Sequence, residues 1–403
     1  MKKDHRKGMF MITPKRKTVL LHVFVFIHTL FLSGCWDRTE VNDLAIITAA
    51  GLDVTDDHQL ELSVSIFVTN PSGGQKVGGM SSGDSGGAGL SIVRSAKGLT
   101  LADATSKLQQ VLPRKVFWGQ DEVFIFGERL ARQGIAEPME YLTRHPAPRE
   151  RGNVFVSKGL AKDVLQLRPP IERSVAEVLR EMAKSQTGLN ITIKELAQMM
   201  AGKAHAAVIP WVEIRQTPDD SFPFINGSAI IQNGKMVGRL NNYTTRGVMW
   251  LRNEIRNATV TVSPKDAKGY VSLYLLRSHT ELVPHIAGKK WSITVKIETQ
   301  DDIIENTTDL DLMKPENIQY LDTVLKTDID NRVVAALAEA QKKMNVDIFN
   351  FADAFYRKYP KEWKQAKDRW HEIYPKVEVR LETNPKVTRP GLTGKSLFKR
   401  DQR

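Results

Sequence analysis

Residues 44–68 read LAIITAAGLDVTDDHQLELSVSIFV, a pattern typical of two β-strands joined by a turn. From Leu60 to Val68 the apolar residues recur at every other position, as they do when one face of a strand is buried. Thr55-Asp56-Asp57 supplies turn residues between the two runs. The pattern therefore predicts strands at residues 44–54 and 60–68.

The size and composition of the chain limit its class. Its 403 residues are enough for two or three domains that each bury a core of their own. Apolar residues make up 41% and charged residues 26%, which is too apolar for a disordered chain and too polar for a protein with many membrane spans. The formal net charge is +12, and residues 1–34 carry half of it. The basic excess therefore gives little support to a nucleic-acid partner.

The N-terminus has the order of a bacterial export signal. A basic stretch ending at Lys17 is followed by the apolar run 19–32, which as a helix is about 21 Å long and falls short of the ~30 Å hydrocarbon core of a bilayer. Leu32-Ser33-Gly34-Cys35 comes next and resembles the lipobox of bacterial lipoproteins. We expect residues 1–34 to be a signal peptide and Cys35 to be the lipid-attachment site. The alternative is a buried Cys35 beside an uncleaved anchor.

Cys35 is the only cysteine, which excludes an internal disulfide framework and any metal site with several thiolates. Its thiol is the nucleophile that takes a diacylglyceryl group in lipoprotein processing. Two acyl chains hold a protein stably on a bilayer, whereas one gives marginal binding. We therefore expect a water-soluble body tethered to the outer face of the cytoplasmic membrane.

Strand and helix signals in the rest of the chain predict an α+β fold, with two to three mixed α/β domains built on largely antiparallel sheets flanked by helices. A helix is expected at residues 100–112, and Thr192 with Glu195 forms a capping box that opens another. Asn233-Gly234 predicts the tight turn of a hairpin. The polar join at 216–223 places a boundary between an N-terminal domain, 35–215, and a C-terminal domain, 216–383.

Three other segments have distinct compositions. Residues 71–89 contain eight glycines and no apolar periodicity, and are expected to be a flexible loop. Pro315 can open a long helix that keeps one apolar stripe as far as about Met344. Residues 384–403 hold six basic residues and few apolar ones, and are expected to be a flexible basic tail.

The sequence offers several fragments of catalytic or metal-binding motifs, and each is incomplete. His279 and His285 lack further ligands at metal-binding spacing. Pro375 stands where the zinc-protease motif begun by His371-Glu372 needs its second histidine. Gly394-Lys395-Ser396 lacks the earlier glycine and the strand-to-helix setting of a phosphate loop. We therefore predict no catalytic, metal or cofactor-binding residues and no enzyme activity.

Two further groups of residues are expected to be structural. The acidic pairs Asp56-Asp57 and Asp301-Asp302 are expected at solvated turns. Eight aromatic residues recur at helical spacing, as a core stripe requires, although such rings could also stack sugars or bases. They are Phe349, Phe351, Phe355, Tyr356, Tyr359, Trp363, Trp370 and Tyr374.

Three stretches resemble the Ger(x)C family, the lipoprotein subunits of nutrient germinant receptors in spore-forming bacteria. The first is CWDRTEVNDL at 35–44, running into Gly51-Leu52-Asp53. The second is PRKVFWGQ at 113–120, with residues 124–128 and 153–156 after it. The third is FINGSA at 224–229, with Asp347-Ile348-Phe349, YPKEW at 359–363 and Pro375-Lys376-Val377. The resemblance covers nearly the whole mature chain in the expected order.

The resemblance implies a role without catalysis. Such proteins sit on the outer surface of the spore inner membrane and act with two integral membrane subunits, an A-type subunit and a transporter-like B-type subunit, in nutrient-triggered germination. Only Cys35 carries over as a functional residue, because no nutrient-site motif is established for this subunit. Two alternatives stay open: a solute-binding lipoprotein of a transporter, with two similar lobes around a cleft, and a cell-envelope hydrolase.

Overall fold

The structure, a computed structural model, describes residues 40–68, 91–186 and 188–389, together with Thr18, Val19, His22 and Phe24. Cys35, most of the predicted signal peptide at 1–34, the glycine-rich segment 71–89 and residues 390–403 lie outside the described residues. The chain divides into two compact units, residues 1–44 and residues 45–403. In the first unit the described residues include a short 3-10 turn at Val41–Asp43.

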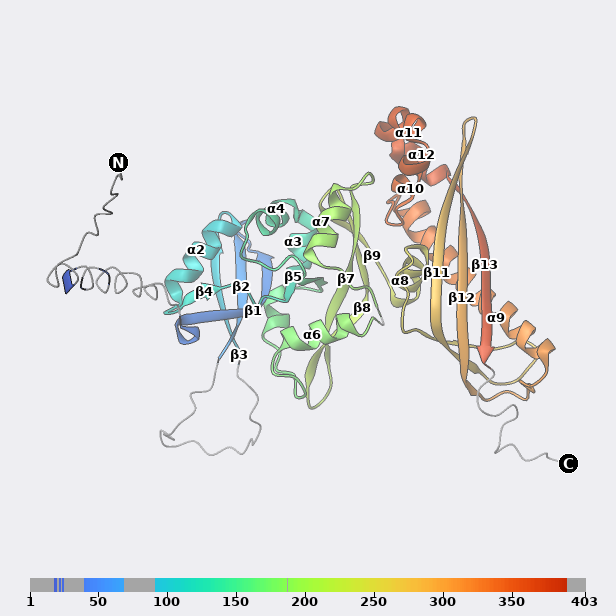
Figure 1. Cartoon of the computed structure of the whole chain (residues 1–403), viewed down its shortest axis with the longest axis horizontal. Coiled ribbons are helices and arrows are strands. Elements are labelled where there is room, and N and C mark those ends of the chain that lie inside the picture. The colour runs from blue at the N-terminus through green and yellow to red at the C-terminus, as the bar shows by residue number, and fades with distance from the viewer. Residues whose placement is uncertain are drawn as a thin grey trace, which may run out of the picture. The chain divides into compact units, whose positions relative to one another are not determined.

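The first sheet is mixed and has nine strands, in the order β3-β2-β1-β5-β6-β7-β8-β9 with β4 paired to β1 (Figure 1). Neighbours along β1, β5, β6 and β7 are parallel, whereas the β1–β2, β2–β3, β7–β8 and β8–β9 pairs are antiparallel. The strands are β1 (Leu44–Val54), β2 (Leu60–Phe67), β3 (Ser91–Gly98), β4 (Lys115–Phe117), β5 (Val123–Gly127), β6 (Asn153–Ser157), β7 (Ala206–Gln216), β8 (Ser221–Gln232) and β9 (Lys235–Leu240).

Helices cover both faces of this sheet. Side chains along a strand alternate between the faces, and both faces carry apolar residues that the helices bury. Phe124 and Phe126 of β5 belong to one buried cluster, whereas Val123 and Ile125 belong to another. The first cluster includes residues of α2 (Leu101–Val111), α3 (Glu128–Gln133), α4 (Ala136–Arg144) and α7 (Ile193–Ala201). The second includes residues of α5 (Ala161–Leu165) and α6 (Val175–Lys184).

The second sheet has four strands in the order β10-β11-β12-β13. They are β10 (Thr259–Val262), β11 (Val271–Ala287), β12 (Lys290–Asn306) and β13 (Glu378–Arg389). Ile293, Val295 and Ile297 of β12 are fully buried and share a core with the long helix α9 (Pro315–Leu337). The chain then forms a π-helical turn at Ala338–Lys343 and three short helices, α10 (Phe351–Lys358), α11 (Pro360–Ala366) and α12 (Trp370–Ile373), beside this sheet (Figure 1). Short 3-10 turns at Lys367–Arg369 and Tyr374–Lys376 flank α12.

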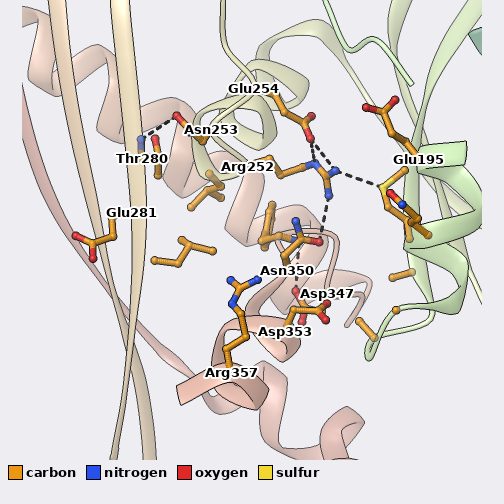
Figure 2. Close-up of a pocket in the computed structure, with 18 of the residues that line it drawn as sticks. Glu195, Arg252, Asn253, Glu254, Thr280, Glu281, Asp347, Asn350, Asp353 and Arg357 are labelled. Atoms are coloured by element: carbon orange, nitrogen blue, oxygen red, sulfur yellow. Dashed lines mark hydrogen bonds and ion pairs between the residues drawn. The ribbon is translucent and has the colours of Figure 1, made fainter. Parts of the chain in front are cut away.

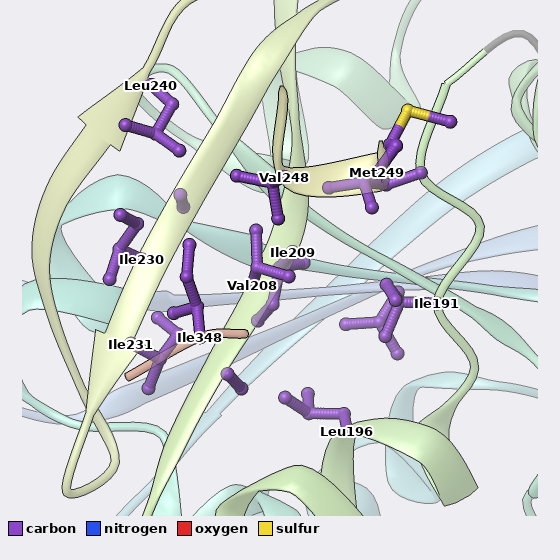
Figure 3. Packing of buried hydrophobic residues seen from close by; sticks show 14 of the residues in the cluster. Ile191, Leu196, Val208, Ile209, Ile230, Ile231, Leu240, Val248, Met249 and Ile348 are labelled. Carbon is purple, nitrogen blue, oxygen red and sulfur yellow. The ribbon is translucent and has the colours of Figure 1, made fainter. Parts of the chain in front are cut away.

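Helix α8 (Asn242–Leu251) connects the cores of the two sheets. Its Val248 and Met249 lie with Val208 of β7 in the cluster drawn in Figure 3, and Ile348 from the segment before α10 reaches the same cluster. On its other side α8 crosses α9 so closely that a Cβ atom on Gly247 would overlap the carbonyl oxygen of Arg332. Residues 45–403 therefore pack as one unit.

The predicted mixed α/β fold is confirmed. Thr100 caps α2, and the capping box of Thr192 and Glu195 opens α7, as the sequence predicts. The hairpin at Asn233-Gly234 forms between β8 and β9 and extends the first sheet. The sheet therefore continues across the boundary predicted between residues 215 and 216, and that boundary stays a prediction.

The predicted basic tail is wrong for residues 384–389, which form the second half of β13. Pro385 and Val387 face inward there, and the Val387 N–H donates to Asp322 of α9 at 2.8 Å. Strands β11 and β12 are long, at 17 residues each. His279 and His285 therefore lie within β11.

The pair Asp301-Asp302 lies within β12 and not at a turn. Asp301 is buried, and burial raises its pKa to about 6 although the Thr299 hydroxyl donates to its carboxylate. Asp56-Asp57 does form the predicted turn between β1 and β2. The aromatic cluster is largely core as predicted, except that Tyr356 is 43% exposed.

Candidate functional site

The described residues enclose a pocket of about 580 Å³ between α7, the end of α8, β11, the segment 347–350 and α10 (Figure 2). A second pocket, of about 370 Å³, shares Glu281, Leu282 and Arg357 with the first. Together they form one groove between β11 and α10, which we call the β11–α10 groove. Two other pockets, of about 660 and 570 Å³, are lined by charged side chains that are all exposed. The β11–α10 groove differs from these two pockets because buried hydrogen bonds hold the polar side chains of its wall in place.

Asp347 fixes the wall that leads into α10. Its buried carboxylate accepts hydrogen bonds from the backbone N–H groups of Phe349, Phe351 and Ala352 and from the indole N–H of Trp370, at 2.7 to 3.2 Å. Burial raises the pKa of Asp347 to about 6, and the four donors offset part of that shift. Because every donor is already directed at its oxygens, Asp347 serves as a structural acceptor.

Arg252 connects the wall to α8. Its guanidinium donates to the carbonyl of Ile348 at 2.9 Å, lies 3.5 Å from Asn350 Oδ1, and pairs with Glu254 at 2.7 Å (Figure 2). It also contacts the sulfur of Met199 on α7. The side chain is only 6% exposed, so its charge is neutralised inside the wall. Arg252 therefore holds three segments together and is not available to a ligand.

Two charged side chains of α10 that line the larger pocket remain available. Asp353 and Arg357 are one helical turn apart, a spacing at which such pairs usually meet. Within the part of the chain that the structure describes, neither has an ion pair or a hydrogen bond. Arg357 projects into the groove in Figure 2. Thr280 of β11, 7% exposed, also lines the groove, and its hydroxyl has no partner among the described residues. The groove thus offers an unpaired carboxylate, an unpaired guanidinium and apolar walls.

The residues singled out from the sequence are placed as follows. Cys35 and Gly394-Lys395-Ser396 lie outside the described residues. His279 borders the groove and His285 does not. No three His, Cys, Asp or Glu side chains come together as a metal site in the described ranges. His371 lies 3.8 Å from Glu372, and both are exposed.

Sequence reasoning missed Arg252, Asp353 and Arg357 as groove residues. Asp347 stands in the quoted stretch Asp347-Ile348-Phe349, but its role depends on donors up to 23 residues away. In the same way Gly227, in the stretch FINGSA, has a φ of +87° and lies against the carbonyl of Leu240, where no Cβ atom would fit. Both stretches contribute to the resemblance seen in the sequence. In each, the structure gives the residue a structural role: Asp347 accepts hydrogen bonds and Gly227 fits against a neighbouring carbonyl.

No helix in the described ranges is both long and apolar enough to cross a membrane.

Comparison with known proteins gives one consistent family. Residues 37–214 match the family described as "Spore germination protein N-terminal domain", and residues 226–391 match "Spore germination B3/ GerAC like, C-terminal". The chain is 27% identical over 372 residues to "Putative spore germination protein YfkR" of Bacillus subtilis (strain 168), covering 91% of this chain and 95% of that protein. It is 26% identical over 395 residues to "Spore germination protein KC" of the same organism, covering 93% and 96%.

A solved structure has the same fold. The "Crystal Structure of the GerBC protein" superposes with a TM-score of 0.56 at 16% sequence identity, covering 84% of this chain and 96% of that one.

Proposed function

The chain belongs to the spore germination GerAC family, and from this premise we propose that it is the membrane-anchored lipoprotein subunit of a spore nutrient germinant receptor, required for nutrient-triggered germination. The family match over residues 37–214 and 226–391 is the observation that carries the proposal. Its partners would be two integral membrane subunits, one A-type and one transporter-like B-type. Its place would be the outer face of the spore inner membrane.

The anchor in this proposal is a diacylglyceryl group on Cys35. The basic start, the apolar run at 19–32 and Leu32-Ser33-Gly34-Cys35 support it, because their order is that of a cleaved lipoprotein signal. Two acyl chains would confine the body to the membrane surface and raise its effective concentration near integral partners. The anchor thereby favours assembly without adding a contact.

We propose a binding role and not a catalytic one. The two best-fixed charged groups of the groove, Asp347 and Arg252, are directed at the protein's own backbone and side chains. A solute-binding lipoprotein is less well supported, since such proteins have two similar lobes. Here the two sheets have nine and four strands and different orders.

The decisive experiment compares Cys35→Ala with Ser33→Ala in the full chain. Ser33→Ala keeps a small residue in the lipobox and should be processed and lipidated normally. The Cys35→Ala chain should incorporate no labelled fatty acid and should no longer yield the mature membrane-bound form. Spores that carry it should germinate less in nutrient. A Cys35→Ala chain that still carried lipid and fractionated as before would contradict the anchor. Normal germination of spores that lack the chain altogether would contradict the receptor role.

A further inference from the structure

Strand β11 has a free edge over half its length. β10 pairs with Val271–Tyr274 only, whereas β11 continues to Ala287. On the other side β12 pairs with β11 all the way to Ala287. Beyond Leu275, which bonds to the carbonyl of Ala258, no strand in the described ranges pairs with the outer edge of β11. This free edge borders the β11–α10 groove.

The direction of the free backbone groups follows from one hydrogen bond. The N–H of Thr280 donates to Asn253 Oδ1 at 2.9 Å, so the backbone groups of Thr280 point away from β12 (Figure 2). Alternate residues of an antiparallel strand share a direction, and Leu282 and Pro284 therefore point the same way. Leu282 offers both an N–H and a carbonyl, while Thr280 and Pro284 offer their carbonyls.

The edge is open only over a short stretch. The Thr280 N–H already donates to Asn253 Oδ1, and Pro284 has no N–H. A long strand therefore could not pair along the whole edge. Such devices are how proteins prevent indiscriminate pairing at sheet edges. Between these two residues a ladder can form around Leu282. The edge therefore suits a short extended segment.

The opposite wall of the groove has the charges to select that segment. Asp353 lies in the larger pocket, near Gly202 just after α7; Lys358 lines the smaller pocket and Arg357 lines both. None of these three side chains has an ion pair in the part of the chain that the structure describes. Leu282, Ala354 and Phe349 provide apolar surface between them. The α10 wall of the groove is therefore acidic near α7 and basic at its other end, while Glu281 on the β11 wall lies 3.9 Å from Lys296.

We propose that a partner protein inserts a short extended segment into the β11–α10 groove, where it adds to β11 as an extra strand beside α10. Its backbone pairs with Leu282 and the neighbouring carbonyls, which gives affinity independent of sequence. A basic side chain of the segment faces Asp353, and an acidic one faces Arg357 and Lys358. The proposal rests on the proposed function, since receptor assembly supplies the partner, and it names the surface and the chemistry of that contact.

Hydrogen exchange of the full chain tests the pairing directly. The probe is the assembly of the full chain with its two integral membrane subunits, compared with the purified full chain alone. The amide of Leu282 should exchange quickly in the chain alone and roughly tenfold or more slowly in the assembly, because a new backbone hydrogen bond protects it. Amides of β13, at the opposite edge of the sheet, serve as the internal control and should change little.

A double charge exchange tests the recognition. Asp353→Lys with Arg357→Glu leaves the net charge unchanged and alters no hydrogen bond in the described residues. It should reduce recovery of the assembly by roughly tenfold, as expected when about 1.4 kcal/mol of contact energy is lost. The matched control is Lys364→Glu with Asp368→Lys, an exposed pair one turn apart that also has no ion pair in the described ranges. This control should assemble as the wild type does.

The outcomes separate the possible occupants. Protection of Leu282 only in the assembly, lost in the groove variant and kept in the control, supports the proposal. Protection already present in the isolated chain would overturn it, because one of its own segments or a second copy would then fill the groove. Unchanged exchange of Leu282 in a stable assembly would overturn the docking surface and leave the receptor role intact. Failure of the wild-type chain to assemble at all would overturn the receptor role and its docking partner together.

Discussion

The carboxylate of Asp53, near the end of β1, accepts the backbone N–H of Ala161 at 2.8 Å although the two residues are 108 positions apart. The N–H of Lys162 donates to the other oxygen at 3.0 Å. Asp53 thus caps the first turn of α5 from outside the helix. A Cβ atom on Gly127 would overlap the same carboxylate, so the glycine at the end of β5 makes room for it. The stretch Gly51-Leu52-Asp53 is explained by this contact between β1 and α5.

Replacing Asp53 by Ala should therefore destabilise the fold. It leaves two N–H groups of α5 without their acceptor in a buried setting, which costs about 1–3 kcal/mol of unfolding free energy. Equilibrium urea unfolding measures the loss. Asp57→Ala is the control, since Asp57 lies at the exposed turn that follows, has no ion pair or side-chain hydrogen bond among the described residues, and its loss should leave the midpoint unchanged. Equal midpoints for the two variants would show that the contact with Ala161 adds nothing.

Asp121 makes the stability of the fold depend on pH. It is fully buried, and among the described residues neither carboxylate oxygen has a well-formed hydrogen bond. Burial raises its pKa well above 3.8, and the nearby N–H of Val123 offsets that shift only in part. An acid whose pKa is higher in the folded state than in the unfolded chain destabilises the fold once the pH exceeds its unfolded pKa, because the unfolded chain then ionises more readily. The wild type should therefore lose up to about 1.4 kcal/mol per pH unit as the pH rises from about 4.

Asp121→Asn removes this titration while keeping the size of the side chain. The difference in unfolding free energy between variant and wild type should shift in favour of the variant from pH 4 to pH 7. Denaturant unfolding at several pH values measures it. A difference that stays constant over this range would mean that Asp121 ionises in the folded state much as it does in the unfolded chain.

Gly247 sets the distance between α8 and α9. Gly247→Ala would place a Cβ atom on the carbonyl oxygen of Arg332, and the helices would have to move apart. We expect a loss of about 1–3 kcal/mol of unfolding free energy, the usual cost of overpacking. Gly188→Ala is the matched control, because nothing lies within 4 Å of a Cβ atom at that position. A neutral Gly247→Ala would mean that the crossing of the two helices is looser than the structure has it.

The elements that the sequence predicts well depend on near neighbours in the chain. The strand at Leu60–Phe67, the capping box at Thr192 and the turn at Asn233-Gly234 depend on residues close together in the chain, and each forms as predicted. The strand is nevertheless buried on both faces and not on one, because helices cover both sides of its sheet. The end of β13 escapes prediction because polar residues interrupt its apolar pattern. Those residues are stabilised by distant partners, such as Asp322 of α9 for the backbone of Val387.

The groove could not be predicted for the same reason. Its wall depends on Arg252 reaching the carbonyl of Ile348, 96 residues away, and on Asp347 accepting hydrogen bonds from residues 349–352 and from Trp370, 23 residues away. Nothing in the local sequence around Arg252 distinguishes it from the exposed Arg256 four residues later. By contrast, the proposed anchor at Cys35 rests wholly on a local pattern and stays a prediction, since it lies outside the described residues.

Arg252→Lys tests how the groove is held open. A lysine can still pair with Glu254, but its single ammonium cannot also reach Ile348 and Asn350 in the fixed geometry of a guanidinium. Because Ile348 is buried, its carbonyl would be left without its donor, and we expect a loss of about 1–3 kcal/mol of unfolding free energy. Arg256→Lys should have little effect, because Arg256 is exposed and, among the described residues, its side chain bonds only to the adjacent carbonyl of Ile255. Faster hydrogen exchange across residues 348–352 in Arg252→Lys alone would locate the damage at the wall. Equal exchange in the two variants would instead mean that the hydrogen bonds to Asp347 are sufficient to hold residues 348–352 in place.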